Sequence, residues 1–264
     1  MRRADLVSIV EDLLGEWDLR TDGDTMRSPQ AVAVPVRTSD ATPAVLKVGH
    51  DGHEHLVLRR WNGDGAARLL RADPHRRALL LERLGSQSLH ALFDVDACET
   101  VAALYGRLHV PAMPQLPSLS SLLAQWADEF AALPRSAAVP HRLVEQAMTL
   151  CRDLAAEPAA RVLHGDLHYD HVLVADREPW LAVSPKPVNG DPHYEVAPML
   201  WHRWDDVADD VRFGVQRRFY AVVDAAGFDE DRARGYAIVR VVRGATRDPD
   251  NLTKYVALAK AVQD

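Results

Sequence analysis

Apolar and polar positions follow different patterns in the two parts of this chain. In the first 84 residues, short runs of β-branched and aliphatic residues alternate with polar turns, which is typical of β-strands. The expected strands cover residues 31–37, 43–48, 67–71 and 77–82. Apolar residues at helical spacing predict helices over 3–16 and 53–61, the second ending at Asn62 and Gly63. These elements predict a small sheet lobe with one crossing helix.

From Ser86 onward the pattern is mostly helical, with one interruption. Residues 161–174 contain an apolar run, a His-Gly-Asp turn and a second apolar run, which predicts a strand, a loop and a strand in a hairpin around Asp166. The change of pattern at residues 83–85 predicts a boundary between residues 1–84 and 85–264. The expected fold class is therefore α/β of the α+β kind.

Composition excludes several classes of protein. A chain of 264 residues with 47% hydrophobic residues suits a globular protein, and no run approaches the roughly 18 apolar residues of a membrane span. Cys98 and Cys151 lie in helical patterns and are expected to be free thiols in a reducing cytoplasm. A net charge of −7 disfavours nucleic acid and is compatible with a cationic substrate. We expect a cytoplasmic protein with neither a nucleic-acid nor a membrane partner, and make no prediction of its oligomeric state.

The turn around Asp166 carries the strongest chemical signal. A carboxylate on a tight turn between two strands can accept a proton from a substrate hydroxyl. The run His164-Gly-Asp-Leu-His, followed later by Ser184-Pro-Lys, resembles the catalytic loop of the aminoglycoside phosphotransferase family, most closely its streptomycin and hydroxyurea kinase branch. That family has Asn where this chain has His171, and Asp where it has Ser184. The resemblance spans about residues 30–262.

The resemblance implies a protein-kinase-like, two-lobed fold and an ATP-dependent phosphotransferase, an enzyme type associated with antibiotic resistance. Residues 1–84 would form a small N-terminal, nucleotide-binding β-sheet lobe, and residues 85–264 a larger helical C-terminal lobe with the catalytic loop and the substrate site. Asp166 would be the catalytic base, in a cleft between the lobes. The acceptor would be a small hydroxylated molecule such as an aminoglycoside, an amino sugar or hydroxyurea.

The same resemblance assigns nucleotide-binding residues in the sheet lobe. Lys47 would anchor the phosphates of ATP or GTP, and Glu54 on the next helix would be its ion-pair partner, because the long lysine side chain needs a carboxylate to orient it. The alternative is a solvated lysine and a solvated glutamate. Residues 79–84 resemble the strand that leads to the hinge of a kinase, which makes Glu82 and Leu84 candidates for binding the adenine.

The metal positions depart from the family pattern. Magnesium prefers hard oxygen ligands, whereas His171 offers a softer imidazole nitrogen and Ser184 a neutral hydroxyl. Nearby carboxylates can substitute, and we consider Asp170, Asp191 and Glu195 candidate ligands, Asp191 first. Three interpretations follow: a kinase with a rearranged metal site, a slow kinase with weak magnesium binding, or a pseudokinase that binds a ligand or partner without turnover.

Two further assignments concern the same region. We expect His168, Asp191 and Glu195 to be candidates for binding the substrate. A zinc-dependent hydrolase is the remaining alternative, because His168-Tyr-Asp-His171 contains enough ligands for zinc. However, Asp166 stands where metallo-β-lactamase-type sites have their first histidine.

Overall fold

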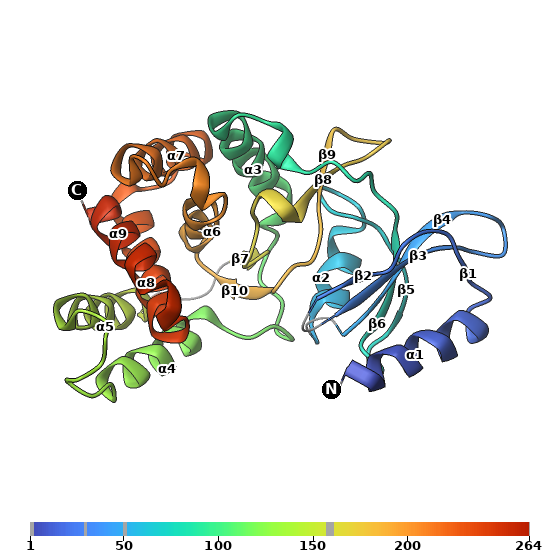
Figure 1. Cartoon of the computed structure of the whole chain (residues 1–264), viewed down its shortest axis with the longest axis horizontal. Helices are drawn as coiled ribbons and strands as arrows, with labels where there is room; N and C mark the ends of the chain where they lie inside the picture. The colour runs from blue at the N-terminus through green and yellow to red at the C-terminus, as the bar shows by residue number, and fades with distance from the viewer. Residues whose placement is uncertain (1–2, 29–30, 50–51, 157–160, 264) are drawn as a thin grey trace. The chain divides into compact units, whose positions relative to one another are not determined.

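The computed structural model describes residues 3–28, 31–49, 52–156 and 161–263 (Figure 1). The chain divides into two compact units, of which the first comprises Met1–Gln87 and Leu173–Lys186, and the second Ser88–Val172 and Pro187–Asp264. The first unit is rich in strands and the second in helices, so the α+β class expected from the sequence is confirmed.

The first unit is built around an antiparallel sheet with strand order β1-β3-β4-β6-β5, and β2 pairs with β3. A separate two-stranded sheet consists of β8 and β9. Two helices, α1 and α2, complete this unit. The bounds are α1 Arg3–Glu16, β1 Arg20–Thr21, β2 Met26–Arg27, β3 Val32–Arg37, β4 Pro43–Val48, α2 Glu54–Trp61, β5 Leu69–Asp73, β6 Ala78–Glu82, β8 Val172–Val174 and β9 Trp180–Ala182.

Alternation along β4 separates the two faces of the large sheet. Ala44, Leu46 and Val48 are fully buried, and they belong to one hydrophobic cluster with apolar residues of α1. Successive side chains of a strand point to opposite faces, so Lys47 projects from the other face. There it contacts Glu54 at the start of α2, which places a charged pair opposite the apolar core.

The expected helices and the β3–β4 hairpin are confirmed, whereas β5 begins two residues later than predicted. Ala66 and Ala67 have other partners: Ala66 forms a bridge with Ala182 of β9, and the N–H of Ala67 donates to the carbonyl of Ala182 at 2.9 Å. Their extended conformation therefore serves a different pairing from that of β5.

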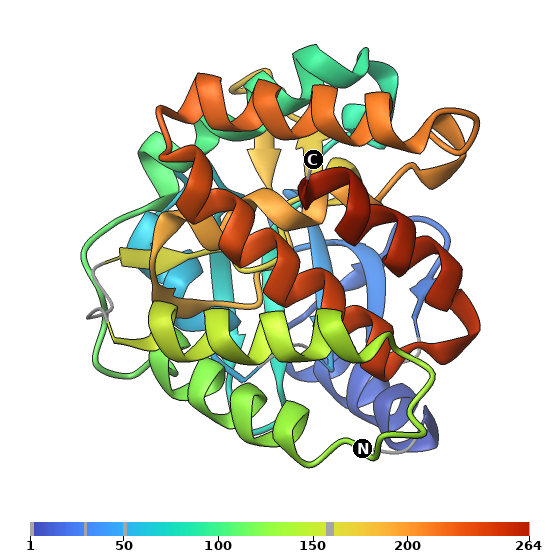
Figure 2. The same ribbon diagram turned by 90° about the vertical axis from the view of Figure 1, so that its left-hand side faces the viewer.

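The second unit consists mainly of helices that pack in pairs. Helix α5 lies beside α4 on one side and packs against α8 on the other, while α7 contacts α3 and α9 (Figure 2). Strands β7 and β10 form a two-stranded antiparallel sheet. The bounds are α3 Asp94–Leu108, α4 Leu119–Ala131, α5 His141–Ala155, β7 Arg161–Leu163, β10 Val188–Gly190, α6 Ala197–Trp201, α7 Val211–Ala226, α8 Glu230–Arg247 and α9 Leu252–Gln263, with 3-10 helices η1 Leu89–Ala91, η2 Tyr169–His171, η3 Pro192–Val196, η4 Trp204–Asp206 and η5 Pro249–Asn251.

The predicted hairpin around Asp166 is wrong in its pairing. The two apolar runs do form strands, but β7 pairs with β10 and β8 pairs with β9. Gly190 of β10 explains how the first pair fits under α4, since a Cβ atom there would lie 2.7 Å from the Cβ of Leu119. The Asp166 turn therefore connects strands of two different sheets.

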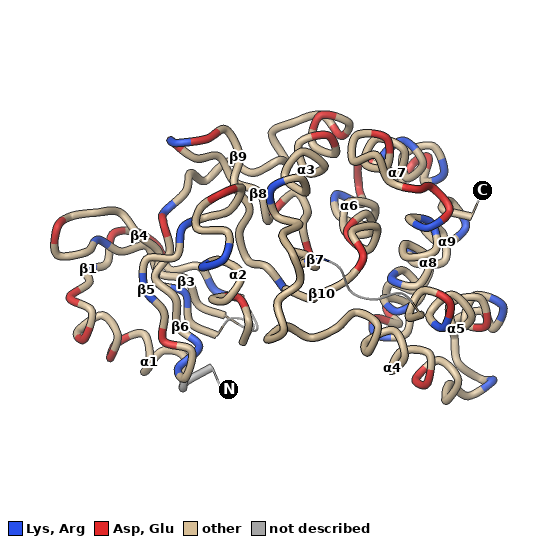
Figure 3. Tube along the Cα trace, turned by 180° about the vertical axis from the view of Figure 1, so that it is seen from behind, with Lys and Arg blue, Asp and Glu red and all other residues tan. Residues whose placement is uncertain are grey.

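Cys98 and Cys151 are buried free thiols in α3 and α5. None of the helices in the described residues is long and apolar enough to cross a membrane. Basic and acidic positions are interspersed along the described parts of both units, so the net charge of −7 is spread over the chain (Figure 3).

Candidate active site

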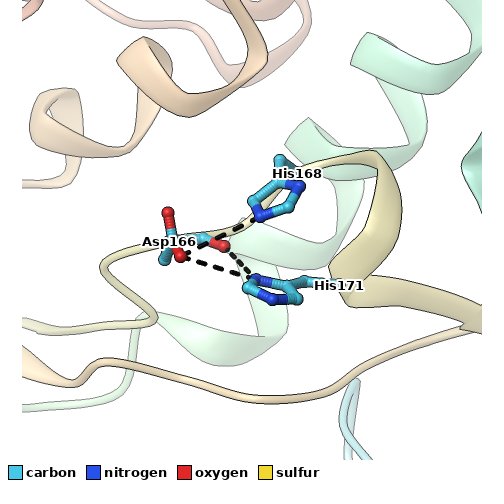
Figure 4. A group of neighbouring side chains, drawn as sticks. All are labelled: Asp166, His168 and His171. Atoms are coloured by element: carbon cyan, nitrogen blue, oxygen red, sulfur yellow. Dashed lines mark hydrogen bonds and ion pairs between the residues drawn. The ribbon is translucent and has the colours of Figure 1, made fainter. Parts of the chain in front are cut away.

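Asp166 lies on a sharp turn that follows β7 in the second unit. Gly165 has a φ of +81°, a conformation that favours glycine because other residues carry a Cβ atom. The Asp166 carboxylate is largely buried, with Oδ2 3.9 Å from Nε2 of His168 and 3.7 Å from Nδ1 of His171 (Figure 4). The structure thus brings together three of the residues that the sequence singled out.

Glu195 and Arg240 hold this turn from two sides. The fully buried Glu195 carboxylate accepts the N–H of His164 at 2.5 Å and that of Gly165 at 3.1 Å. Arg240 of α8 donates to the carbonyl of Gly165 at 3.0 Å. Burial opposes ionisation of Glu195, but His109, His164 and the Gly165 N–H outweigh it and hold the pKa of this carboxyl below its ordinary value. Glu195 therefore supports the turn from inside the unit, rather than facing solvent as a substrate-binding residue would.

The imidazoles beside Asp166 occupy defined positions. Nδ1 of His171 lies 2.7 Å from the carbonyl oxygen of Asp166, a hydrogen bond that orients the ring. The ring of His168 stacks on that of His202, with centroids 3.4 Å apart. Burial and the neighbouring rings of His171 and His202 lower the pKa of His168 to about 2, and burial lowers the pKa of His202 to about 4. Both rings are neutral at physiological pH.

A buried ionic network lies under η2, the 3-10 turn that contains His171. The hydroxyl of Tyr169 donates to Asp94 at 3.0 Å, and the fully buried Arg218 donates to the same carboxylate at 2.8 and 3.2 Å. Arg217 adds a third cation, with Nη2 3.1 Å from Asp94. This network ties the start of α3 and helix α7 to the segment that follows Asp166.

Asp191 is engaged by its own neighbours. Its carboxylate caps η3 by accepting the N–H of His193 at 2.9 Å, lies 2.5 Å from Nδ1 of the same residue and pairs with Arg232. Across the described part of the chain, the groups of metal-ligand atoms near Asp166 include neither Asp191 nor Glu195. Of the three substitute carboxylates, Asp170 alone belongs to one of these groups, with His168 and His202.

Lys47 and Glu54 form the predicted ion pair in the first unit. Nζ of Lys47 lies 2.8 Å from both carboxylate oxygens of Glu54, which is 1% exposed, so the alternative of two solvated charges is wrong. The lysine also donates to Oγ of Ser184 at 3.1 Å. Ser184 has a φ of +57°, a left-handed conformation that serine seldom adopts and that aspartate and asparagine tolerate better. The backbone at this position thus suits the residue of the family pattern.

Glu82 and Leu84 differ in how their polar groups are used. The Glu82 carboxylate accepts from Arg177 at 2.8 and 3.0 Å and from the N–H of Arg68 at 2.9 Å, and its own N–H donates to the carbonyl of Arg68. Among the described residues, no hydrogen bond involves the backbone of Leu84. The role of Leu84 in binding adenine stays a prediction.

The two positions where the family pattern has metal ligands belong to different units, His171 to the second and Ser184 to the first. Magnesium demands oxygen ligands in near-ideal octahedral geometry. His171 presents a nitrogen, and the hydroxyl of Ser184 accepts a hydrogen bond from Lys47. We therefore derive no chemical step through magnesium.

Sequence reasoning missed Arg240 and His202. Both come from segments more than 30 residues after Asp166, and each is an ordinary polar residue of a helical region. The only signal was that the resemblance to the family spans about residues 30–262 and so includes both positions, without indicating that the ring of His202 stacks on His168.

Sequence comparisons identify relatives of this chain among known proteins. The sequence model described as aminoglycoside/hydroxyurea antibiotic resistance kinase matches residues 16–251. The chain is 39% identical to streptomycin 6-kinase of Streptomyces glaucescens, over 93% of this chain and 83% of that protein. It is 36% identical to hydroxyurea phosphotransferase of Kitasatospora aureofaciens, over 89% of this chain and 70% of that protein.

A solved structure gives the fold independently. Macrolide 2'-phosphotransferase of Brachybacterium faecium superposes with a TM-score of 0.61 at 13% identity, covering 98% of this chain and 96% of that one. The expected protein-kinase-like fold is thus confirmed, as is the resemblance found in the motifs. The chain belongs to the aminoglycoside/hydroxyurea antibiotic resistance kinases and is a phosphotransferase.

Proposed function

We propose that this protein transfers the γ-phosphoryl group of ATP to a hydroxyl group of an aminoglycoside, with Asp166 as the base. The observation that carries the proposal is the support of the Asp166 turn by Glu195 and Arg240, which hold the peptide groups on either side of Gly165. A rigid turn fixes a carboxylate where it can orient an acceptor hydroxyl. The 39% identity to a protein named streptomycin 6-kinase supports streptomycin as the first acceptor to test.

The bond changes of the proposed step involve the acceptor hydroxyl, the γ-phosphoryl group and the Asp166 carboxylate. The acceptor oxygen forms a bond to the γ-phosphorus, the bond between that phosphorus and the β–γ bridging oxygen breaks, and ADP leaves. The hydroxyl proton passes to the Asp166 carboxylate. An in-line transfer of this kind depends mainly on positioning and on neutralising the phosphate charge.

Lys47 is assigned to the phosphates. Its ammonium group is held by Glu54 and Ser184 in the first unit, and a lysine ordered in this way offers a fixed positive charge. We assign nucleotide binding to residues 1–84, with the backbone of Leu84 contacting the adenine, and acceptor binding to residues 85–264. Glu82 acts by positioning this segment through Arg177 and Arg68.

The test is phosphate transfer from radiolabelled ATP to streptomycin by Asp166→Asn. We expect turnover to fall on the order of 10²- to 10⁴-fold with little change in ATP affinity, because the base acts on the acceptor. Asp176→Asn is the matched control, since Asp176 is exposed in the loop between β8 and β9 and should not alter turnover. Unchanged turnover in Asp166→Asn would remove Asp166 from the mechanism.

A second candidate function is nucleotide binding without turnover. It is favoured by Ser184, because a hydroxyl bonded to Lys47 takes the place of a metal-binding carboxylate. In the same assay, ATP binding without transfer to streptomycin, to other aminoglycosides or to hydroxyurea would support this candidate over the kinase.

A further inference from the structure

The Asp166 turn carries an unusual concentration of imidazoles. His168, His171 and His202 lie together with Asp166 and Asp170, and we call these five residues the histidine cluster. Within it, ligand atoms of Asp166, His168 and His171 lie within 4.8 Å of one another, and so do those of His168, Asp170 and His202. His168 belongs to both groups and lies between the two carboxylates, and Figure 4 shows the first group.

The separations between carboxylate oxygens and ring nitrogens of the cluster are too long for hydrogen bonds. Oδ2 of Asp166 lies 3.9 Å from His168 and 3.7 Å from His171, while Oδ2 of Asp170 lies 3.6 Å from Nδ1 of His168 and 4.0 Å from Nδ1 of His202. Two ligands bound at about 2.0 Å to one tetrahedral ion are about 3.3 Å apart. Rotations that shorten the first two separations by about half an ångström would therefore let Oδ2 of Asp166, Nε2 of His168 and Nδ1 of His171 share an ion. Nδ1 of His168 lies on the other side of the ring, toward Asp170, and cannot bind the same ion.

The ring nitrogens of His168 and His171 differ in the contacts that they already make. Among the described residues, Nε2 of His168 makes no hydrogen bond, and the N–H of Asp170 donates to Nδ1 of the same ring. The bond from His171 to the Asp166 carbonyl is the contact that must be exchanged, because Nδ1 cannot donate a proton and bind an ion together.

We propose that the histidine cluster binds one zinc-type ion, Zn²⁺ or Co²⁺, in preference to Mg²⁺. Imidazole nitrogen suits zinc and its neighbours in the first transition series, whereas magnesium requires oxygen ligands. The ligands would be Oδ2 of Asp166, Nε2 of His168 and Nδ1 of His171, and His202 would support the ring of His168 by stacking on it. This inference goes beyond phosphotransfer, because it concerns the metal preference of the turn and requires no nucleotide.

The test uses Co²⁺ alone as a spectroscopic probe. The full-length protein, without a histidine tag and freed of metal with a chelator, is titrated with Co²⁺ while its visible absorption is recorded. We expect one equivalent to produce the bands of a low-symmetry, nitrogen-containing site. Zn²⁺ should abolish these bands at one equivalent, whereas a hundredfold excess of Mg²⁺ should leave them.

Single histidine variants test whether Co²⁺ binds at the histidine cluster. His171→Asn and His202→Asn should each weaken Co²⁺ binding by about tenfold or more, as loss of groups at a metal site commonly does. His141→Asn is the control, because His141 is an exposed histidine of α5 that pairs only with Glu145 among the described residues. Equal Co²⁺ binding by the unmodified protein and both cluster variants, or displacement of Co²⁺ by Mg²⁺, would overturn the inference. Phosphotransfer is assayed separately, so failure of the metal site and failure of the proposed kinase activity are distinguishable.

Discussion

Replacing Asp94 with Asn should destabilise the protein through one buried cation. Arg218 is 0% exposed, and removing the charge of its carboxylate partner breaks a buried pair, which costs about 3–5 kcal/mol. Arg218 keeps two acceptors, the carbonyls of His202 at 2.7 Å and Arg203 at 3.1 Å. The new amide group, however, places a donor beside the Tyr169 hydroxyl and the guanidinium. We therefore expect a loss of about 3 kcal/mol, which corresponds to a decrease in Tm of roughly 6–12 °C.

The measurement is urea unfolding followed by circular dichroism, supported by a thermal scan. Asp96→Asn is the matched control, because Asp96 is exposed in the same first turn of α3. This substitution removes the same charge from the helix N-terminus as Asp94→Asn does. We expect the control to lose no more than about 0.5 kcal/mol. If Asp94→Asn and Asp96→Asn lose equal stability, the buried network does not contribute as reasoned.

Low pH should remove the stabilisation that the ionised Asp94 carboxylate provides. Burial opposes ionisation of Asp94, but the hydrogen bonds and charge of Arg218 outweigh it and hold the pKa below its ordinary value. A carboxyl whose folded pKa is depressed contributes stability above its unfolded pKa, about 4, and loses it as pH falls through the folded pKa. The stability difference between the unmodified protein and Asp94→Asn should therefore be constant near pH 6 and shrink below about pH 4. A difference that grows on acidification would contradict this sign.

Three further outcomes are expected. The double variant His171→Asn with Ser184→Asp should increase the dependence of ATP binding on magnesium in calorimetry, because oxygen ligands return; strong dependence in the unmodified protein would refute this. Glu54→Gln should weaken ATP binding by about tenfold, because the lysine of its ion pair loses the charge that orients it; unchanged affinity in the same titration would exclude that role. Gly190→Ala should lower the midpoint of urea unfolding, because its Cβ would meet Leu119, whereas Gly106→Ala, with no atom within 4 Å of the added Cβ, should not; equal midpoints would contradict it.

Local patterns in the sequence determined much of the fold and the chemistry of the site. The α1 helix and the β3–β4 hairpin were predictable because their periodicities of about 3.6 and 2 residues are visible within short windows. The Lys47–Glu54 pair was predictable from the resemblance to the family, because Lys47 on a strand and Glu54 on the next helix stand in the order of the kinase plan. The His-Gly-Asp run marked the turn, since few residues other than glycine tolerate its φ.

The tertiary structure alone decided which segments meet at the turn. Three-residue apolar runs indicate strands but not their partners, so the pairing of β7 with β10 and of β8 with β9 was not predictable. Glu195 was expected to face a substrate, yet its carboxylate is buried against the N–H groups of His164 and Gly165. His202 and Arg240 reach the turn from other helical segments of the second unit. Such contacts depend on how distant parts of the chain pack, and no periodicity within one segment encodes them.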